Sequence, residues 1–596
     1  MSARDERKKK RKRKGASASK PRRVSERGAA KKGTAKKDTA KKGTAKKGAA
    51  EKGAAEKSAA DGNQPREDGT HEAPALAPRQ RFGHLLLAAL GGALQCLGFA
   101  GFSLWPFALV CFLPMFYVVE VERPTRFRRL FALGLAHGFV GYTGGYYWLV
   151  DMLENFSGFE GWPNWAFASI FFLYQAGQHV LIYWVYARAR RRGWPILGAA
   201  VASLLSFELI YPVLFPSFLS TGFHDVTPFI QIADLGGPML VSAVVMSVNA
   251  ALFELLWAWR RGPLPRRSPA IAAAAVALTL AYGYWHIAEV DARAEAAPKL
   301  TVGVVQVNMG IFDKRADPLE GHRRHLVQSR RLERNHDDLD LLVWPESAYT
   351  FFLREGVQNL KRRVLGPLST PTLFGGLARR EGEERMLAFN TAYLIDGAGD
   401  VLGTYDKTYL LMFGEYLPFG ETFPILYDWS PNSGRFTPGD HVRPLELGDV
   451  RISTLICYED VLPGFTREAV REGDPHLLVN ITNDAWFGDT HEPWIHLALA
   501  KFRAVEHHRA LVRSTNSGVS AFVDPAGRVL HTIGVFEQGE AAEELALLEG
   551  DTLYLVLGDW PGWAALFAMV WMSFVGRRRR EDPAPEGDAD DAAAAA

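Results

Sequence analysis

Three residues that could together perform nucleophilic catalysis, Glu346, Lys407 and Cys457, lie at the ends of apolar runs in the C-terminal half of the chain. Cys457 is one of only three cysteines among 596 residues. Apolar runs of this length are typical of buried strands, which can deliver polar side chains to a shared sheet edge. The sequence therefore predicts a carboxylate, an ammonium and a thiol in one site. The three runs are 341–344, 401–405 and 450–456.

The chemistry expected of this set is attack by the Cys457 sulfur. A thiol is a weak nucleophile until it loses its proton, so a base must lie within hydrogen-bond reach, and Glu346 is the candidate. Lys407 would stabilise both the thiolate and a tetrahedral oxyanion, and the backbone N–H of Tyr458 could be a second donor. For each residue taken alone the structural interpretation is favoured: an acidic turn residue, a surface lysine or a small buried cysteine. Only the combination favours the catalytic interpretation.

The elements that must position these residues alternate between strands and helices, which predicts an α/β sandwich. Turn residues at 397–400 and 524–527 indicate hairpins, so the sheets should be mixed rather than purely parallel. The expected strands are 300–307, 339–344, 371–375, 390–395, 401–405, 450–456, 477–482 and 518–523, and the expected helices are 320–335, 464–472 and 494–508.

The order and the flanks of the three residues resemble the nitrilase, or carbon-nitrogen hydrolase, superfamily, over about residues 299–555. Further matching text lies at 483–488, 503–506 and 513–518. The resemblance implies a four-layer α-β-β-α fold in which the Glu is the general base, the Lys stabilises the oxyanion and the Cys carries an acyl group. It also implies a supporting carboxylate at Glu415, which would orient Lys407 or assist proton transfer.

Several other residues are candidates for the same site. Glu459 could be catalytic or could hold loop backbone near the nucleophile, and both interpretations stay open. Trp486 and Phe487 could form an apolar lid or belong to the ordinary core. The remaining candidates for substrate contact are Tyr349, Phe351, Phe352, Leu411, Met412 and Phe413.

We expect neither a metal nor another cofactor, because His491, His507 and His508 form no separate ligand pattern with carboxylates. The chain departs from the resembled family at one point. Many relatives carry a tryptophan after the first strand, whereas residues 308–315 of this chain contain none. Phe312 could replace it as an apolar contact.

Eight long apolar segments predict membrane-spanning helices, seven before the catalytic region and one after it. Arginine clusters alternate with loops that hold few basic residues, so the positive-inside rule places every cluster in the cytoplasm and the catalytic region outside it. The segments are 84–99, 105–121, 129–150, 164–187, 195–214, 233–258, 270–287 and 561–576, and the clusters are 123–129, 188–192, 260–267 and 577–580.

Composition varies sharply along the chain, so the averages of 48% hydrophobic residues and a net charge of +3 conceal distinct parts. The basic N-terminal tail has too few apolar residues to fold. It could attract anionic lipid or be a solvated extension, and no nucleic acid is expected. The predicted parts are a disordered cytoplasmic tail (1–80), a membrane domain (81–288), an extracytoplasmic catalytic domain (289–559), an eighth span (560–577) and a second disordered cytoplasmic tail (578–596).

This arrangement resembles the apolipoprotein N-acyltransferase family of the bacterial cytoplasmic (inner) membrane, over about residues 84–576. The resemblance implies that Cys457 takes a fatty acyl chain from a membrane phospholipid as a thioester. The acyl chain then passes, in a ping-pong reaction, to the α-amino group of the diacylglyceryl-cysteine of an apolipoprotein. A monomer is expected. The alternatives are a membrane-anchored amidase with the same triad, and a transporter or scaffold whose external domain only binds.

Overall fold

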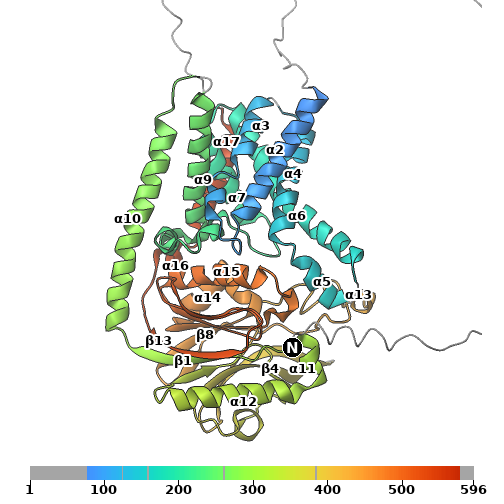
Figure 1. Ribbon diagram of the computed structural model, residues 1–596, viewed down its shortest axis with the longest axis vertical. Helices are drawn as coiled ribbons and strands as arrows, with labels where there is room; N and C mark the ends of the chain where they lie inside the picture. Colours follow the sequence, from blue (N-terminus) through green and yellow to red (C-terminus); the bar gives the residue numbers. More distant parts are fainter. Residues whose placement is uncertain (1–76, 124, 158–159, 260–261, 383–384, 577–596) are drawn as a thin grey trace, which may run out of the picture. The chain divides into compact units, whose positions relative to one another are not determined.

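The computed structural model describes residues 77–576 apart from 124, 158–159, 260–261 and 383–384 (Figure 1). The predicted tails therefore lie almost entirely outside the described residues. Helix α2 (Pro78–Leu97) already begins with a proline at its first position, where the missing N–H costs nothing. The boundary predicted at residue 80 thus falls inside a helix.

Close backbone contacts hold the first helices of the membrane domain together. Helix α4 (Phe127–Gly145) packs between α2 and α6 (Trp162–Arg191). A Cβ atom added at Gly92 would lie only 2.1 Å from the carbonyl oxygen of His137. A small residue at this position therefore permits the approach of α2 to α4, as at many helix contacts in membranes.

The remaining long helices continue the bundle. Helix α7 (Ile196–Ile210) contacts both α17 (Trp560–Phe574) and α9 (Ala233–Trp259), and α10 (Arg267–Ala296) runs along α9 (Figure 1). The shorter elements are η1 (Trp105–Leu109), α3 (Leu113–Val121), α5 (Leu149–Ser157), η2 (Leu219–Phe223) and α8 (Thr227–Ile230).

Helical structure occurs in all eight segments predicted to span the membrane. By length and composition, α9 and α10 are able to cross a membrane, while 105–121 and α7 are shorter apolar helices. The count of seven spans plus one therefore stays a prediction. The stretch between the predicted spans 129–150 and 164–187 contains most of α5, a helix that contributes to the site.

Two of the arginine clusters meet at one end of the bundle. The guanidinium of Arg123 donates to the carbonyl oxygen of Arg190 at 3.1 Å, and that of Arg188 donates to the carbonyl oxygen of Ser573 at 3.0 Å. The catalytic domain lies at the opposite end (Figure 1). The location of the catalytic domain outside the cytoplasm stays a prediction.

The catalytic domain contains two mixed sheets, as predicted. The first has the order β13-β1-β2-β4-β5-β6 with β3 also paired to β4, and the second has the order β12-β11-β10-β9-β8-β7. The strands of the first sheet are β1 (Lys299–Gln306), β2 (Leu341–Val343), β3 (Tyr349–Arg354), β4 (Thr372–Glu381), β5 (Met386–Ile395), β6 (Val401–Asp406) and β13 (Gly539–Ala546). Those of the second are β7 (Leu445–Leu447), β8 (Val450–Ile456), β9 (Leu477–Thr482), β10 (Ala510–Thr515), β11 (Ser520–Val523) and β12 (Val529–Ile533).

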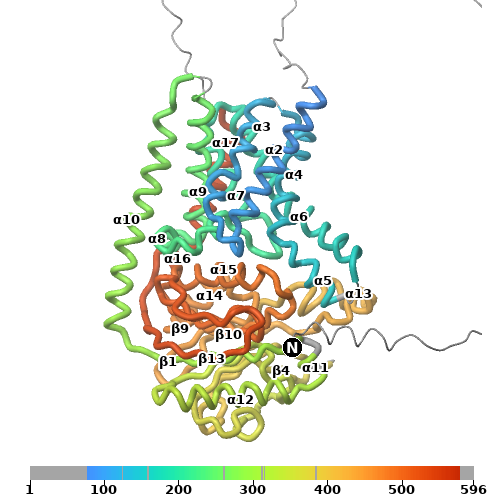
Figure 2. Tube along the Cα trace, in the orientation of Figure 1, coloured from blue at the N-terminus to red at the C-terminus, as the bar shows by residue number. Residues whose placement is uncertain are grey.

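The two sheets stack between helices and form the expected four layers (Figures 1 and 2). Strand β1 faces β10 across the interface, where the Ser514 hydroxyl donates to the Val343 carbonyl oxygen at 3.1 Å. Helix α12 (Pro318–Asn335) covers the first sheet, while α14 (Pro463–Gly473) and α15 (Glu492–His507) cover the second, on the side of the membrane helices.

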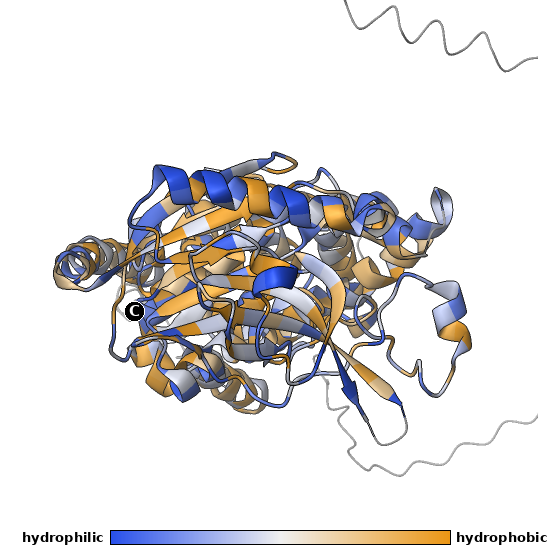
Figure 3. Cartoon of the chain, turned by 90° about the horizontal axis from the view of Figure 1, so that it is seen from below, coloured by the Kyte–Doolittle hydropathy of each residue, from blue (hydrophilic) through white to orange (hydrophobic). Residues whose placement is uncertain are grey.

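The outer helices alternate apolar and polar residues, whereas the strands between them are largely hydrophobic (Figure 3). In α12 the buried residues Gly321, His325, Gln328 and Leu332 recur at helical spacing, so a single stripe faces the sheet. The side chain of Asp317 caps this helix by accepting from the backbone N–H of Glu320 at 3.2 Å. Local sequence signals therefore account for this outer layer.

One glycine of β4 sets the position of the residue predicted to be the base. A Cβ atom at Gly375 would lie 2.6 Å from the Cα of Glu346. We expect Gly375→Ala to lower the free energy of unfolding by about 1–3 kcal/mol and to displace Glu346, because backbone rather than a flexible side chain must move. Thermal unfolding of the detergent-solubilised protein measures the change.

Gly376→Ala is the matched control for this prediction, since its added Cβ would meet only ring atoms, at 3.3 Å from Tyr393 and farther from Phe374. Equal stability of the two variants would contradict the steric argument.

Candidate active site

Glu346, Lys407 and Cys457 lie on the wall of one cavity of about 540 Å³, together with Glu415. All three of the strand-end residues are at least nine-tenths buried. Glu346 follows β2, Lys407 follows β6 and Cys457 follows β8. Since β2 and β6 belong to one sheet and β8 to the other, the cavity lies where strand ends of both sheets meet.

Cys457 occupies an unusual backbone conformation at the end of its strand. Its φ is +53°, in the left-handed region that residues other than glycine rarely adopt. The chain turns there from β8 into the short helix η4 (Cys457–Val461). The side-chain amide of Asn480 donates to the carbonyl oxygen of Cys457 at 3.1 Å and to that of Leu455 at 3.2 Å. These two bonds support the sharp turn that presents the sulfur.

A chain of polar contacts joins the carboxylates and the ammonium in the cavity. The Nζ of Lys407 lies 2.7 Å from Oε2 of Glu415. The side-chain amide of Asn390 donates to Glu346 at 2.6 Å and to Glu415 at 2.9 Å. Glu415 therefore holds Lys407 directly and is linked to Glu346 through one shared donor.

The surroundings of the three residues shift their pKa values in directions that suit a general base and a protonated thiol. Burial raises the pKa of Cys457 well above its usual value, and the charge of Glu346 adds to this effect while that of Lys407 opposes it. Burial also raises the pKa of Glu346, against the influence of Lys407. Burial alone would lower the pKa of Lys407, but Glu415 above all raises it, so the ammonium stays charged. A neutral thiol thus faces a carboxylate with increased proton affinity.

Glu459 is engaged almost entirely with backbone. One carboxylate oxygen accepts from the N–H groups of Thr408 and Tyr409, at 2.8 and 2.9 Å, and the other accepts from the N–H of Ile456 at 2.8 Å. The hydroxyl of Tyr405 adds a fourth bond at 2.9 Å. Glu459 does not line the cavity in the described part of the chain. The geometry favours the scaffolding alternative over direct participation.

The side chain of Tyr458 points away from the nucleophile, toward the membrane domain. Its hydroxyl donates to the carbonyl oxygen of Leu214, and its ring meets that of Phe215 edge-on with centroids 5.8 Å apart. The residue predicted to supply an oxyanion donor through its backbone therefore also joins the nucleophile's turn to a membrane segment.

The residues predicted to contact the substrate divide into two groups. Trp486, Phe487, Phe351 and Leu411 line the cavity. The described residues that line the cavity do not include Tyr349, Phe352, Met412 or Phe413. The Tyr349 ring instead packs against His322 and Phe351. The Phe352 ring lies under the guanidinium of Arg379. Met412 lines a neighbouring pocket, and the side chain of Phe413 is half exposed. The side chain of Phe312, proposed as an apolar contact, lies outside the described residues.

Helix α5 contributes to the cavity wall, which the sequence did not predict. Its Phe156 stacks on Trp486 with ring centroids 4.4 Å apart, and both line the cavity. The side-chain amide of Asn155 donates to the carbonyl oxygen of Trp486, and that of Asn432 donates to the carbonyl oxygen of Asn155, each at 2.9 Å. Residues 149–157 are strongly amphipathic at helical spacing, and this pattern could have identified the helix from the sequence.

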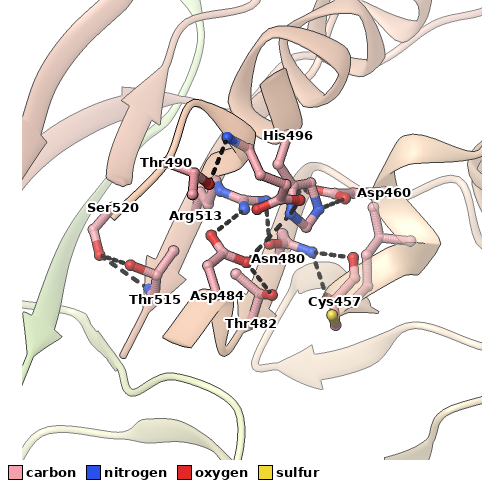
Figure 4. A network of polar contacts seen from close by, with 12 residues as sticks. Cys457, Asp460, Asn480, Thr482, Asp484, Thr490, His496, Arg513, Thr515 and Ser520 are labelled. Atoms are coloured by element: carbon pink, nitrogen blue, oxygen red, sulfur yellow. Dashed lines mark hydrogen bonds and ion pairs between the residues drawn. The ribbon is translucent and has the colours of Figure 1, made fainter. Parts of the chain in front are cut away.

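A buried ionic network lies behind Cys457 (Figure 4). The guanidinium of Arg513 donates to Asp460 at 2.8 Å, to Asp484 at 2.9 Å and to Asn480 at 2.9 Å. His496 lies between the same two carboxylates, 2.7 Å from Asp460, and they raise its pKa to about 10 against the effect of burial. Since Asn480 also holds the Cys457 carbonyl, this network fixes the nucleophile's turn from behind.

The expectation for His508 needs correction. Its Nε2 lies 3.3 Å from a carboxylate oxygen of Asp234, and Nε2 of His286 lies at the same distance from that oxygen. Local sequence patterns could not predict this cluster, because its members come from three distant segments. The hydroxyl of Tyr282 also donates to Asp234, at 2.6 Å, so hydrogen bonds of the chain account for the arrangement. A second group with metal-ligand atoms close together consists of Asp484, Glu492 and His496.

Comparison with known proteins agrees with a membrane domain joined to a carbon-nitrogen hydrolase domain. A family model described as apolipoprotein N-acyltransferase N-terminal domain matches residues 91–251, and one described as carbon-nitrogen hydrolase matches residues 301–548. Among solved structures, an amidase from Nesterenkonia is similar with a TM-score of 0.30 and 23% identity, over 43% of this chain and 92% of that one.

Curated relatives extend over most of the chain. An apolipoprotein N-acyltransferase from Geobacter metallireducens is 30% identical, over 83% of this chain and 95% of the relative. One from Azotobacter vinelandii is 31% identical, over 85% of this chain and 97% of the relative. The chain therefore belongs to the apolipoprotein N-acyltransferase family and is an enzyme of that family with a carbon-nitrogen hydrolase domain.

The shifted pKa of Glu346 predicts the pH dependence of Cys457 chemistry. The base must be ionised to accept the thiol proton, so the rate should rise with pH through a pKa above the ordinary glutamate value. Asn390→Leu removes a donor that stabilises the ionised carboxylate, so the rising limb of the pH–rate profile should move to higher pH. Release of p-nitrophenol from a p-nitrophenyl ester, measured against pH, tests both statements.

Thr391→Val is the neighbouring control, because the Thr391 hydroxyl donates to Asp406 and not to the carboxylates of the cavity. A limb that stays in place in Asn390→Leu would show that Glu346 does not control the reaction.

Proposed function

We propose that this protein transfers a fatty acyl chain from a membrane phospholipid, through a thioester at Cys457, to the α-amino group of the N-terminal diacylglyceryl-cysteine of an apolipoprotein. The observation that carries the proposal is the cavity in which Cys457, Glu346 and Lys407 meet, because one of its walls is built by α5 of the membrane domain. The names of the relatives that cover most of the chain support it.

In the first half-reaction Glu346 takes the proton of the Cys457 thiol while the sulfur attacks the ester carbonyl carbon of the phospholipid. Lys407 and the backbone N–H of Tyr458 stabilise the tetrahedral oxyanion. The intermediate collapses when the carbon–oxygen bond of the ester breaks. The lysophospholipid oxygen receives the proton from Glu346, and the acyl chain stays on the sulfur.

In the second half-reaction the neutral α-amine of the acceptor attacks the thioester carbonyl. Glu346 takes a proton from the nitrogen, and the carbon–sulfur bond breaks to give the amide and the Cys457 thiolate, which recovers the proton. Glu415 is a positioning residue, since its 2.7 Å contact keeps Lys407 charged and oriented in both halves. Glu459 is a second positioning residue, because it holds the backbone next to Lys407.

Transfer must be faster than hydrolysis, so water must be kept away from the thioester. The apolar wall of Phe156, Trp486, Phe487 and Phe351 supports this requirement. A membrane-anchored amidase with the same triad would instead let water reach the acyl-enzyme and would release a free acid and ammonia.

The arrangement of the helices supports a place in the bacterial cytoplasmic membrane with the catalytic domain outside. Arginines of the clusters 123–129 and 188–192 lie together at the end of the bundle that is remote from the cavity. Both substrates would then enter from the outer leaflet, where the proposed reaction needs them. The proposed enzyme acts as a monomer, as the sequence analysis expects.

Cys457→Ala and Cys457→Ser should abolish transfer while the protein still folds, because no other group of the cavity can form the thioester. The test incubates the purified enzyme with labelled phospholipid, looks for a hydroxylamine-sensitive adduct, and then adds a diacylated lipopeptide with a free amino terminus. Cys111→Ala, at a buried cysteine of the membrane domain, is the control. Full transfer by either Cys457 variant would rule out the covalent route.

Lys407→Arg should reduce the rate of thioester formation by at least about a hundredfold. A planar guanidinium cannot replace a compact ammonium that lies 2.7 Å from Glu415 and is 1% exposed. The same labelled-donor assay measures the loss. A rate equal to that of the unaltered enzyme would place Lys407 outside the chemistry.

A further inference from the structure

The cavity contains a second buried lysine that the proposed mechanism does not use. Lys314 belongs to the short helix α11 (Ile311–Ala316) that follows β1, within the segment that departs from the family's tryptophan pattern. It is 7% exposed and lines the same cavity as Cys457. Lys314 and Lys407 are the basic residues among the described lining residues.

The two lysines differ in their counter-charges. Lys407 lies 2.7 Å from Glu415, whereas within the described residues Lys314 has no carboxylate within ion-pair distance. The polar contact of its Nζ is with the carbonyl oxygen of Ser347, at the long distance of 3.5 Å. A buried ammonium without a close partner is costly, so this side chain is suited to an anion that enters the cavity.

During the proposed reaction the Lys314 ammonium loses a nearby negative charge, which increases the stabilisation that a bound anion would give it. Burial lowers the pKa of Lys314 to about 8, although the charge of Glu346 raises it in part. When Glu346 takes the proton of Cys457, that opposing charge disappears. Lys407 is then opposed by Glu415 and by the oxyanion, while no carboxylate of the described residues lies within ion-pair distance of Lys314. An anion on the substrate would stabilise Lys314 most at this step.

We propose that Lys314 binds the phosphodiester of the acyl donor and thereby selects a phospholipid over a neutral ester. This assignment rests on the proposed function for its substrate. The phosphodiester is the anionic group that a phospholipid carries beside its acyl esters, and lysine binds phosphate as a point charge. A cavity of about 540 Å³ is large enough for a glycerophosphate group together with the start of an acyl chain.

Protection of Cys457 from alkylation tests the site without any acyl transfer. A phospholipid with ether-linked chains carries the phosphodiester but cannot donate an acyl group. It should slow the reaction of Cys457 with iodoacetamide, and the concentration needed should rise by about 10- to 100-fold in Lys314→Gln. Lys314→Arg should keep most of the protection, because it keeps the positive charge.

Lys501→Gln is the matched control, since Lys501 is equally buried but pairs with Asp225 at 3.2 Å and does not line the cavity. Its protection curve should equal that of the unaltered enzyme. A dialkylglycerol with the same chains lacks the phosphate, and its protection should be the same in the enzyme and in Lys314→Gln.

Three results would overturn the proposal. Equal weakening of protection by the phospholipid and by the dialkylglycerol in Lys314→Gln would mean that Lys314 acts on the shape of the cavity. Unchanged protection in Lys314→Gln would place the phosphate elsewhere. Protection by inorganic phosphate at the same concentration as the lipid would assign the site to free phosphate.

The donor assay then separates this proposal from the proposed function. With ester-linked donors, the ratio of thioester formation from phospholipid to that from diacylglycerol should fall by about 10- to 100-fold in Lys314→Gln. If neither donor acylates the unaltered enzyme, the proposed function fails, while the protection experiment still decides whether Lys314 binds a phosphodiester.

Discussion

The carboxylate of Glu459 joins the two halves of the site, and the relative position of Lys407 and Cys457 depends on it. Thr408 and Tyr409 follow β6 of the first sheet, while Ile456 ends β8 of the second, and Glu459 accepts from all three backbone N–H groups. Loss of this group would leave several buried donors without partners. One buried side chain thus holds the cation beside the nucleophile across the sheet interface.

The charged groups of the cavity are linked by a short set of polar contacts, which suits the proposed proton transfer. Asn390 donates to both Glu346 and Glu415, and Lys407 opposes Glu415 directly. Because burial increases the proton affinity of Glu346, the carboxylate can accept the thiol proton and later return it. Behind the sulfur, Arg513 and Asn480 keep the left-handed turn in place (Figure 4).

The membrane domain and the catalytic domain share the cavity rather than merely lying side by side. Phe156 of α5 stacks on Trp486, and Tyr458, next to the nucleophile, bonds to Leu214 of a membrane segment. A movement of either segment would therefore reach the turn that carries Cys457. The physical consequence is that the membrane segments and the turn that carries Cys457 are joined by a continuous set of contacts.

The sequence by itself determined the strand-end positions of Glu346, Lys407 and Cys457, the mixed sheets and the helical character of the apolar segments, because these follow from local patterns of apolar and turn residues. Strands β3, β7, β10, β12 and β13 were not predicted, and in β13 the glutamates and alanines make no apolar run. Only the tertiary structure decided that Asn390, Lys314 and α5 meet at the site, that Glu459 binds backbone groups next to both sheets, and that His508 lies beside Asp234 and His286. Such meetings join segments far apart in the chain, and their partners are selected by packing, about which a local pattern carries no information.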